Sequence, residues 1–450
     1  MEQAFRALPK NENFEVNFSK LDNTQRAAVQ SESNNVVIRA SAGSGKTSTL
    51  ITAIAAYRYE RLNDRICAIT YTRAARAEME ERLHIMGIYD VEVTTIHVWA
   101  RELLNEFGIK YDFKVRILEE GDIKTILEDI VENYRLRTGG GIKNKINIGI
   151  LYSYITGNKN MDITDNYRRT LAALEERYIQ YKRDNVLYDF TDYPLYLYDV
   201  MCAYNETINN IDALFVDEFQ DVDSTQFEIF KKVNSNKKFF IGDSWQSIFV
   251  FRGADGAVFT KLEDFDLYKL GYNYRSYQEI IDYACSVYEE LKPRVEDGYE
   301  CYITEVNFSE PSSIVCNKGY GGSVSIISGF GSGVYFQNRI NYYMDLKKIK
   351  EVFNKLIETN PMILCRTNKQ VKAIQESGYL NVSTVHQAKG LEYNNVIVID
   401  TPIKSIEDLN IAYVALTRAR DNVMVMGWND LEELWLRKGF GASTTTFKRW

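Results

Sequence analysis

A glycine-rich run near the N-terminus carries residue types that bind phosphate. The run ASAGSGKT (residues 40–47) directly follows the apolar segment 36–38, and a helical pattern begins at once after it. This order of strand, glycine-rich turn and helix N-terminus presents backbone N–H groups and a helix dipole to phosphate oxygens. We expect Lys46 to reach the β- and γ-phosphates of ATP and Thr47 to hold Mg²⁺, although Ala40 stands where the strict pattern has glycine. The predicted phosphate-binding residues are Ala42, Gly43, Ser44, Gly45, Lys46, Thr47 and Ser48.

The segment ALFVDEFQD (213–221) supplies the carboxylates that such a site needs. Four apolar residues run directly into Asp217 and Glu218, which places both acids at the carboxyl end of a buried strand. Ligands bind at that edge in open α/β sheets. We therefore expect Asp217 to coordinate Mg²⁺, mostly through water, and Glu218 to orient or deprotonate the attacking water. The predicted reaction is hydrolysis of ATP, with Mg²⁺ as the cofactor.

Short apolar runs that alternate with helical patterns predict the elements that position these residues. Such alternation is typical of an α/β fold with parallel sheets and helices on both faces. Between about 100 and 205 helical periodicity dominates instead, which predicts a mostly helical insertion in the first sheet. The predicted strands are 36–38, 66–70, 91–95, 213–216 and 239–241 in a first set and 324–327, 362–365, 396–400 and 423–426 in a second.

The composition limits the classes of protein to consider. Of the 450 residues 45% are hydrophobic and 26% charged, which is ordinary for a folded soluble protein. No apolar run approaches the ~20 residues of a membrane helix, and the N-terminus lacks a signal pattern. We therefore expect a cytoplasmic protein with no membrane partner.

The six cysteines include no CxxC pair, which disfavours a zinc site or a disulfide framework. The net charge of −8 does not exclude nucleic acid, because a local basic groove can exist on an acidic protein.

Further motifs follow one another along the chain and resemble those of superfamily 1 helicases of the UvrD/Rep/PcrA group. VDEFQD (216–221) and IGDSWQSIFVFRGA (241–254) resemble motifs II and III of that group. The other matching segments, in chain order, are LDNTQRAAV (21–29), AITYTRAARAEM (68–79), TTIHVWA (94–100), LGYNYRS (270–276), LCRTN (364–368), VSTVHQAKGLEY (382–393) and AYVALTRAR (412–420). A single motif would be weak, but this many in the right order are not a coincidence.

The resemblance implies roles around ATP. It implies that Gln25 reads the adenine, that Tyr274 stacks on it and that Glu392 contacts the ribose. It also implies that Gln246 senses the γ-phosphate and the water. A planar guanidinium suits the charge that spreads over phosphoryl oxygens in the transition state. Arg275 is accordingly implied to contact the γ-phosphate and Arg418 to be the arginine finger, so that the predicted catalytic residues are Lys46, Asp217, Glu218, Gln246, Arg275 and Arg418.

The resemblance also implies single-stranded DNA along the top of the two sheets. Tyr71, Phe249 and Phe251 match aromatic positions that hold bases, and stacking of this kind is indifferent to sequence. Two departures are visible, because Arg73-Ala74 replaces an Asn-Lys pair and Phe251 replaces a tryptophan. The remaining predicted DNA contacts are Thr72, Arg73, His97, Trp99, Arg252, Arg366, Asn368, His386 and Lys389.

The motif order predicts the domain organisation. Residues 1–100 and 205–269 are expected to form a first RecA-like motor domain, which binds ATP, and 101–204 a helical, 1B-like insertion. Residues 270–450 are expected to form a second, 2A-like RecA domain. Larger relatives carry a regulatory 2B subdomain before motif V, but only fifteen residues (369–383) separate Asn368 from Thr384 here. We therefore expect no 2B-like domain.

These observations predict an ATP-dependent DNA helicase or translocase that moves 3′→5′ on single-stranded or tailed duplex DNA. An alternative is an ATP-gated DNA-binding motor subunit of a larger complex, with little unwinding of its own. Its protein partner would be a nuclease or a replication or repair factor. A scaffold with a dead ATPase is disfavoured because the hydrolytic residues are present. A superfamily 2 RNA helicase is disfavoured because VDEFQD and VALTRAR replace the patterns of that group.

Overall fold

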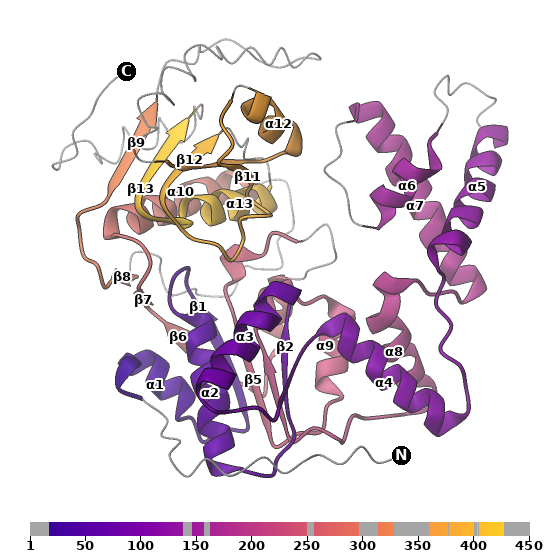
Figure 1. Ribbon diagram of the computed structural model, residues 1–450, viewed down its shortest axis with the longest axis horizontal. Coiled ribbons are helices and arrows are strands. Elements are labelled where there is room, and N and C mark those ends of the chain that lie inside the picture. Colours follow the sequence, from indigo (N-terminus) through magenta and orange to yellow (C-terminus); the bar gives the residue numbers. More distant parts are fainter. Residues whose placement is uncertain are drawn as a thin grey trace. The chain divides into compact units, whose positions relative to one another are not determined.

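Two parallel β-sheets and their helices make up most of the computed structural model (Figure 1). The structure describes residues 18–137, 146–156, 163–249, 256–296, 314–327, 360–376, 378–399, 403 and 405–426. The prediction of an α/β fold with parallel sheets is confirmed. The first sheet and its helices form one compact unit, and the helical insertion and the second sheet belong to the other.

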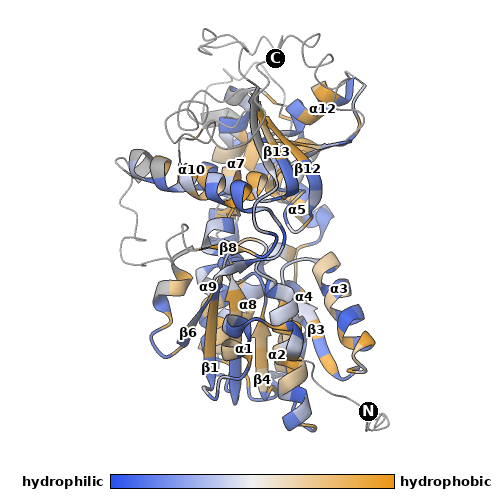
Figure 2. Ribbon diagram, turned by 90° about the vertical axis from the view of Figure 1, so that its left-hand side faces the viewer, coloured by the Kyte–Doolittle hydropathy of each residue, from blue (hydrophilic) through white to orange (hydrophobic). Residues whose placement is uncertain are grey.

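The first sheet has six strands in the spatial order β3-β2-β4-β5-β1-β6, and all neighbours are parallel. Its strands are β1 (Asn35–Ala40), β2 (Ile66–Thr70), β3 (Val91–Thr95), β4 (Ala213–Val216), β5 (Lys237–Gly242) and β6 (Asp266–Leu270). Parallel strands are covered on both faces and are therefore apolar. β2 and β4 are accordingly buried at every position, and β1 and β4 appear in hydrophobic colours in Figure 2. The strand β6 was not predicted, because it is an edge strand whose residues are mostly exposed.

Side chains cap the N-termini of several helices beside this sheet. Asp22 caps α1 through a capping box with Gln25, and Thr72 caps α3 by accepting from the N–H of Ala75. The helices of this unit are α1 (Asn23–Val29), α2 (Lys46–Glu60), α3 (Arg73–Ile85), the start of α4 (Ile96–Tyr111) and α9 (Ser224–Lys231), with short 3₁₀ turns η1 (Phe18–Lys20), η3 (Phe219–Asp221), η4 (Ser244–Gln246) and η6 (Gly256–Lys261). The apolar faces of α1, α2 and α3 pack in one core with strand residues such as Ile38 and Phe215.

The helical insertion lies in the chain between β3 and β4, and we use this name for the described residues from 112 to 204. These residues form helices and no strand, as α5 (Glu120–Arg137), α6 (Ile148–Ile155), α7 (Asp165–Asn185), η2 (Phe190–Asp192) and α8 (Tyr193–Ala203). Helices α5, α6 and α7 pack together around a small core that contains Leu127, Leu171 and Leu174. The insertion therefore has its own hydrophobic centre.

A buried ion network joins α7 to η2 in this insertion. The ammonium group of Lys182 contacts the carboxylates of Asp189, at 2.8 Å, and Asp192. Tyr178 donates a further hydrogen bond to Asp189 at 3.0 Å. Burial alone would raise the pKa of Asp189, but the Lys182 charge together with hydrogen bonds from Lys182 and Thr191 outweighs burial and lowers that pKa. Burial and the charge of Asp189 raise the pKa of Asp192. The negative charges of the two buried carboxylates are therefore balanced by the positive charge of Lys182.

We expect Lys182→Met to lower the free energy of unfolding of the insertion by about 3–5 kcal/mol, because it leaves buried carboxylates without a cation. Urea unfolding followed by circular dichroism measures the effect. The matched control is Lys124→Met, which breaks the exposed pair of Lys124 with Glu120 in the same insertion and should leave the urea midpoint nearly unchanged. Equal midpoints for the two variants would contradict the prediction.

The second sheet has five parallel strands in the order β11-β10-β12-β13-β9. They are β9 (Ser323–Ile327), β10 (Met362–Cys365), β11 (Val382–Thr384), β12 (Tyr393–Ile399) and β13 (Ala419–Met426), accompanied by α10 (Gln278–Glu296), α12 (Asn368–Glu376) and α13 (Ile406–Leu416). The two short strands β7 (Tyr272–Asn273) and β8 (Val315–Cys316) complete the elements. Helix α13 is buried from Leu409 to Leu416, which explains its apolar sequence. None of the described helices is long and apolar enough to cross a bilayer.

Candidate functional site

The glycine-rich run forms the loop between β1 and α2. Gly43 and Gly45 have φ values of 68° and 77°, a left-handed conformation that glycine adopts without strain. A Cβ at Gly45 would also lie 2.9 Å from Nε2 of Gln25. Because α2 begins at Lys46, the N–H groups of its first turn, which includes Thr47 and Ser48, lack partners within the helix. With the helix dipole, this geometry fits the phosphates of a nucleotide.

Three donors hold the carbonyl groups of this loop. Nε2 of Gln25 donates to the carbonyl of Ser44 at 2.9 Å. The side-chain amide of Asn273 donates to Ala42 at 2.5 Å, and the backbone N–H of Tyr274 donates to Gly43 at 2.8 Å. These hydrogen bonds hold the loop in place through its carbonyl oxygens. Backbone N–H groups of a loop held in this way can bind an anion. Asn273 was missed by the sequence prediction, although it stands beside Tyr274 in LGYNYRS.

The two residues predicted to contact adenine lie together beside the loop. The hydroxyl of Tyr274 donates to Oδ2 of Asp22 at 2.6 Å. Burial and this carboxylate raise the pKa of Tyr274, which therefore remains a protonated donor at neutral pH. Asp22 in turn accepts from the N–H of Gln25 at 2.9 Å. The structure thus brings Gln25 and Tyr274 to one side of the loop, and their contacts with a base remain predictions.

The hydroxyl of Thr47 donates to Oδ2 of Asp217 at 3.3 Å, so the two predicted Mg²⁺ ligands are adjacent. Burial, aided by the neighbouring Glu218, raises the pKa of Asp217 to about 7, whereas the charge of Lys46 acts in the opposite direction. Among the described residues, no cluster of three or more His, Cys, Asp or Glu side chains could hold a metal. Mg²⁺ in phosphate sites needs only one or two protein ligands, because water and phosphate supply the rest. Thr47 and Asp217 fit this requirement.

Glu218 lies directly after Asp217 with a φ of 51°, an unusual left-handed conformation for a residue other than glycine. Its carboxylate accepts a hydrogen bond from the side chain of Gln220 at 2.5 Å. Gln246, on the turn after β5, donates from Nε2 to Oδ2 of Asp243 at 2.7 Å. Parallel pairing of β4 with β5 brings these two turns to the same edge of the sheet. The sequence prediction included neither Gln220 nor Asp243.

In the second unit, Glu392 binds two arginines. Its Oε1 lies 2.6 Å from Nε of Arg275, and its Oε2 lies 2.9 Å from Nη2 of Arg420. Arg275 also donates to the carbonyl of Thr417 at 3.0 Å. Burial alone would raise the pKa of Glu392, but the two arginines outweigh it and lower that pKa. Both oxygens of the residue predicted to contact ribose are thus used inside the protein, and Arg420 was not predicted.

Arg418 is almost completely buried, with 1% of its surface exposed. Its Nε donates to the carbonyl of Val414 at 3.1 Å and its Nη1 to that of Leu391 at 3.2 Å. The guanidinium is therefore held by backbone carbonyls of the second unit. The arginine-finger role stays a prediction.

Two aromatic residues of the predicted DNA set stack on each other in the first unit. The rings of Tyr71, after β2, and Phe249, after η4, lie 5.0 Å apart at an angle of 19°. Thr72 caps α3 and Arg73 is its first residue, beside Tyr71, and both side chains are exposed. His97 lies in the first turn of α4 and is half-buried. These five positions lie at or just after the carboxyl ends of β2 and β3 or follow η4, where ligands of such sheets bind.

The assignment of Trp99 to the DNA set was wrong. Its side chain is 2% exposed and its ring lies 6.3 Å from that of Phe230 in the core. The buried hydrophobic residues of α4 are Ile96, Trp99, Ala100, Leu103, Leu104 and Phe107. That spacing is the apolar face of a helix, and Trp99 is part of it. A ring in this position cannot meet a base.

The remaining predicted DNA contacts lie in the second unit or outside the described residues. Arg366 follows β10 and forms an ion pair with Asp408 at 3.0 Å. Asn368 begins α12, and His386 and Lys389 lie in the turns after β11, all three partly exposed. Phe251 and Arg252 lie outside the described residues.

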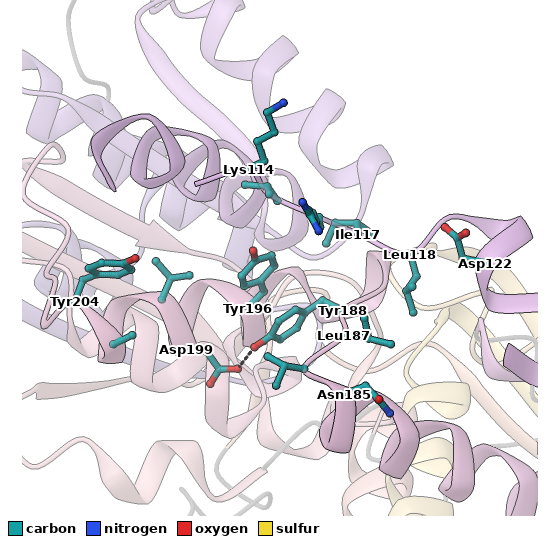
Figure 3. A pocket seen from close by; sticks show the side chains of 15 residues that line it. Lys114, Ile117, Leu118, Asp122, Asn185, Leu187, Tyr188, Tyr196, Asp199 and Tyr204 are labelled. Atoms are coloured by element: carbon teal, nitrogen blue, oxygen red, sulfur yellow. Dashed lines mark hydrogen bonds between the residues drawn. The ribbon is translucent and has the colours of Figure 1, made fainter. Parts of the chain in front are cut away.

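A separate cavity of about 880 Å³ lies in the helical insertion (Figure 3). Tyr188 and Tyr196 stack in its wall with ring centroids 4.1 Å apart, and the hydroxyl of Tyr188 donates to Asp199 at 2.7 Å. Lys114 and Arg116 line it together with Asp122 and Asp199, so its charges select neither an anion nor a cation. None of the predicted site residues lines this cavity.

Known proteins match most of this chain. Residues 21–265 match the family described as UvrD/REP helicase N-terminal domain, and residues 334–429 match the UvrD-like helicase C-terminal domain. A "Probable DNA helicase" of Mycoplasma pneumoniae is 25% identical over 89% of this chain and 82% of its own length.

The matches to longer relatives cover a smaller share of those relatives' own length. A "Probable DNA helicase II homolog" of Mycoplasma capricolum is 29% identical over 61% of this chain, and the match covers 41% of that protein. An "ATP-dependent DNA helicase Rep" of Buchnera aphidicola is 28% identical over 59% of this chain and 45% of its own length. The chain thus spans less than half the length of these two relatives. Since the first family covers more than half of the chain, this protein belongs to the UvrD/REP helicase family.

Proposed function

We propose that this chain is an ATP-hydrolysing motor that moves 3′→5′ along single-stranded DNA and separates the strands of a tailed duplex. The observation that carries the proposal is the P-loop with Thr47 and Asp217 adjacent and Glu218 next in the chain. Several relatives are named ATP-dependent DNA helicases, which supports DNA as the second ligand.

Residues of the first unit and two arginines of the second divide the work of hydrolysis. Lys46 binds the β- and γ-phosphates, and Thr47 and Asp217 hold Mg²⁺. When bound, Mg²⁺ neutralises charge on the phosphate oxygens. Glu218 orients the attacking water and accepts its proton. Arg275 and Arg418 supply guanidinium charge in the transition state, where charge spreads over the phosphoryl oxygens.

A base-holding surface on the first unit would link this chemistry to movement. Tyr71 and Phe249 offer stacked rings, and stacking on an aromatic ring contributes ~1–3 kcal/mol per base whatever the sequence. Phe249 lies three residues after Gln246, so the base contact and the γ-phosphate sensor share one short segment. DNA and ATP would therefore affect each other's binding by linkage.

A second candidate function is that of a motor subunit that binds DNA under ATP control inside a larger complex and unwinds little alone. The observation that favours it is the short segment of fifteen residues (369–383) between Asn368 and Thr384. We propose that this segment holds no 2B-like domain, and that residues 1–100 with 205–269, 101–204 and 270–450 are the first motor domain, the 1B-like insertion and the 2A-like domain. The protein partner would then be a nuclease or a replication or repair factor.

One experiment separates these functions. ATP turnover is measured with and without single-stranded DNA, followed by strand displacement on duplexes with a 3′ or a 5′ tail. We expect DNA to stimulate turnover and only the 3′-tailed duplex to be separated. Stimulated turnover without displacement would favour the motor-subunit function, and displacement of the 5′-tailed duplex alone would contradict the polarity. Absence of turnover with and without DNA would contradict the ATPase.

A further inference from the structure

A buried glutamine links two turns at the carboxyl edge of the first sheet, the turn after β4 that carries Glu218 and the turn after β5 that carries Asp243. Gln220 is 0% exposed. Its Nε2 donates to Oε2 of Glu218 at 2.5 Å, and its Oε1 accepts from the backbone N–H of Asp243 at 2.8 Å. The hydroxyl of Ser247 donates to its backbone carbonyl at 3.1 Å. Both ends of the amide are therefore engaged, one on the turn after β4 and the other on the turn after β5.

The end of β5 is shaped to admit this side chain. A Cβ at Gly242 would lie 2.4 Å from Oε1 of Gln220 and 2.9 Å from its backbone nitrogen. Any larger residue would force the amide away from the N–H of Asp243. The close approach of the two turns thus needs glycine at this position.

The linkage continues beyond Asp243. Oδ1 of Asp243 accepts from the N–H of Trp245 at 3.1 Å, and Oδ2 accepts from the side chain of Gln246 at 2.7 Å. Gln246 is itself 3% exposed. Glu218, Gln220, Asp243 and Gln246 form one continuous chain of contacts, with backbone and side-chain atoms of Asp243 in the middle.

We propose that Gln220 is a positioning residue for hydrolysis, which holds the Glu218 carboxylate toward the water and ties it to the Asp243–Gln246 turn. An amide suits this task because it donates at one end and accepts at the other. It is also neutral, so it does not compete with the carboxylates for Mg²⁺. Because Gln220 is buried, solvent cannot easily replace its hydrogen bonds. The inference rests on the proposed ATP hydrolysis.

The test uses Gln220→Met, which keeps the length of the side chain and removes both hydrogen bonds of the amide. We expect kcat for DNA-stimulated ATP hydrolysis to fall ~10–100-fold, the usual effect of removing a group that orients a reacting residue. KM for ATP and the affinity of a fluorescent ATP analogue should stay close to those of the unaltered protein, because the hydrogen bonds of Gln220 go to Glu218, Asp243 and Ser247 and not to the P-loop. A loss confined to kcat is not expected from a general weakening of the fold.

Ser247→Ala is the matched control. It removes one buried hydrogen bond to the same residue but leaves the Gln220 amide in place, so kcat should be close to that of the unaltered protein. If Gln220→Met does not fold, Gln220→Glu replaces it in the test. That variant keeps an acceptor for Asp243 but replaces the donor to Glu218 with a second carboxyl group, whose negative charge repels Glu218. We therefore expect kcat to fall again.

The outcomes are distinct. A fall in kcat at unchanged KM in Gln220→Met or Gln220→Glu, with Ser247→Ala unaffected, supports the positioning role. Native kcat in a folded Gln220 variant overturns it while leaving the ATPase intact. An equal fall in Ser247→Ala also overturns it, because the defect would then follow from packing. If the unaltered protein hydrolyses no ATP, the proposed function fails and this inference fails with it.

Discussion

Replacing Arg418 by alanine is expected to lower DNA-stimulated kcat by about 10³–10⁵-fold, the range in which arginine fingers act in phosphoryl transfer. The physical reason is that negative charge spreads over the phosphoryl oxygens in the transition state, where a guanidinium binds more strongly than in the ground state. Binding of ATP should therefore change much less than turnover. Steady-state hydrolysis and equilibrium binding of a nucleotide analogue give the two quantities.

The buried position of Arg418 requires a control for folding. Its guanidinium also holds the carbonyls of Val414 and Leu391, so alanine removes structural bonds as well. Arg418→Lys keeps the charge but not the planar geometry, and we expect it to fold yet remain slow. Lys318→Ala breaks an exposed pair with Asp421 in the same unit and should leave kcat unchanged. Near-normal turnover in a folded Arg418→Ala protein would rule out the finger role.

Lys46→Ala is expected to reduce ATP hydrolysis to background, a loss of at least ~10²–10³-fold by analogy with removal of a preorganised donor from an oxyanion site. Lys46 is the first residue of α2, and its charge acts on both Asp217 and Asp243. The Lys46 charge thus acts at the same two carboxylates beside which we expect the terminal phosphates. Turnover and thermal unfolding of the purified variant test this, since the fold should be preserved.

Glu218→Gln provides the contrast to Lys46→Ala. It keeps the shape of the side chain and the phosphate-binding loop, so ATP should still bind while hydrolysis becomes very slow. If Lys46→Ala turned over ATP normally, the P-loop assignment would be wrong. If Glu218→Gln lost nucleotide binding instead of turnover, the roles of Asp217 and Glu218 would have been assigned incorrectly.

The error at Trp99 shows where motif position misleads. TTIHVWA matches a family motif, and the match alone suggested a contact with DNA. The helical spacing of Trp99 with Ile96 and Leu103 was already readable in the sequence and predicts a core position. The burial of Trp99 follows from that periodicity, which should have taken precedence for an apolar side chain.

Local sequence determined the parallel sheets, the P-loop and the place of Asp217 and Glu218. Each depends on a short stretch, because an apolar run that ends in glycines or acids sets both the strand and the residue at its end. Edge strand β6 was missed because its exposed face lacks such a run.

The tertiary structure alone decided which of these residues meet. The Gln220–Asp243 bond joins residues 23 positions apart, and the Arg275–Glu392 pair joins residues 117 positions apart. The first of these contacts is set by the register of β4 against β5 and by the space that Gly242 leaves. Pairing register and side-chain packing are properties of the folded chain, so no local pattern shows that Gln220 meets Asp243 or that Glu392 is occupied by two arginines.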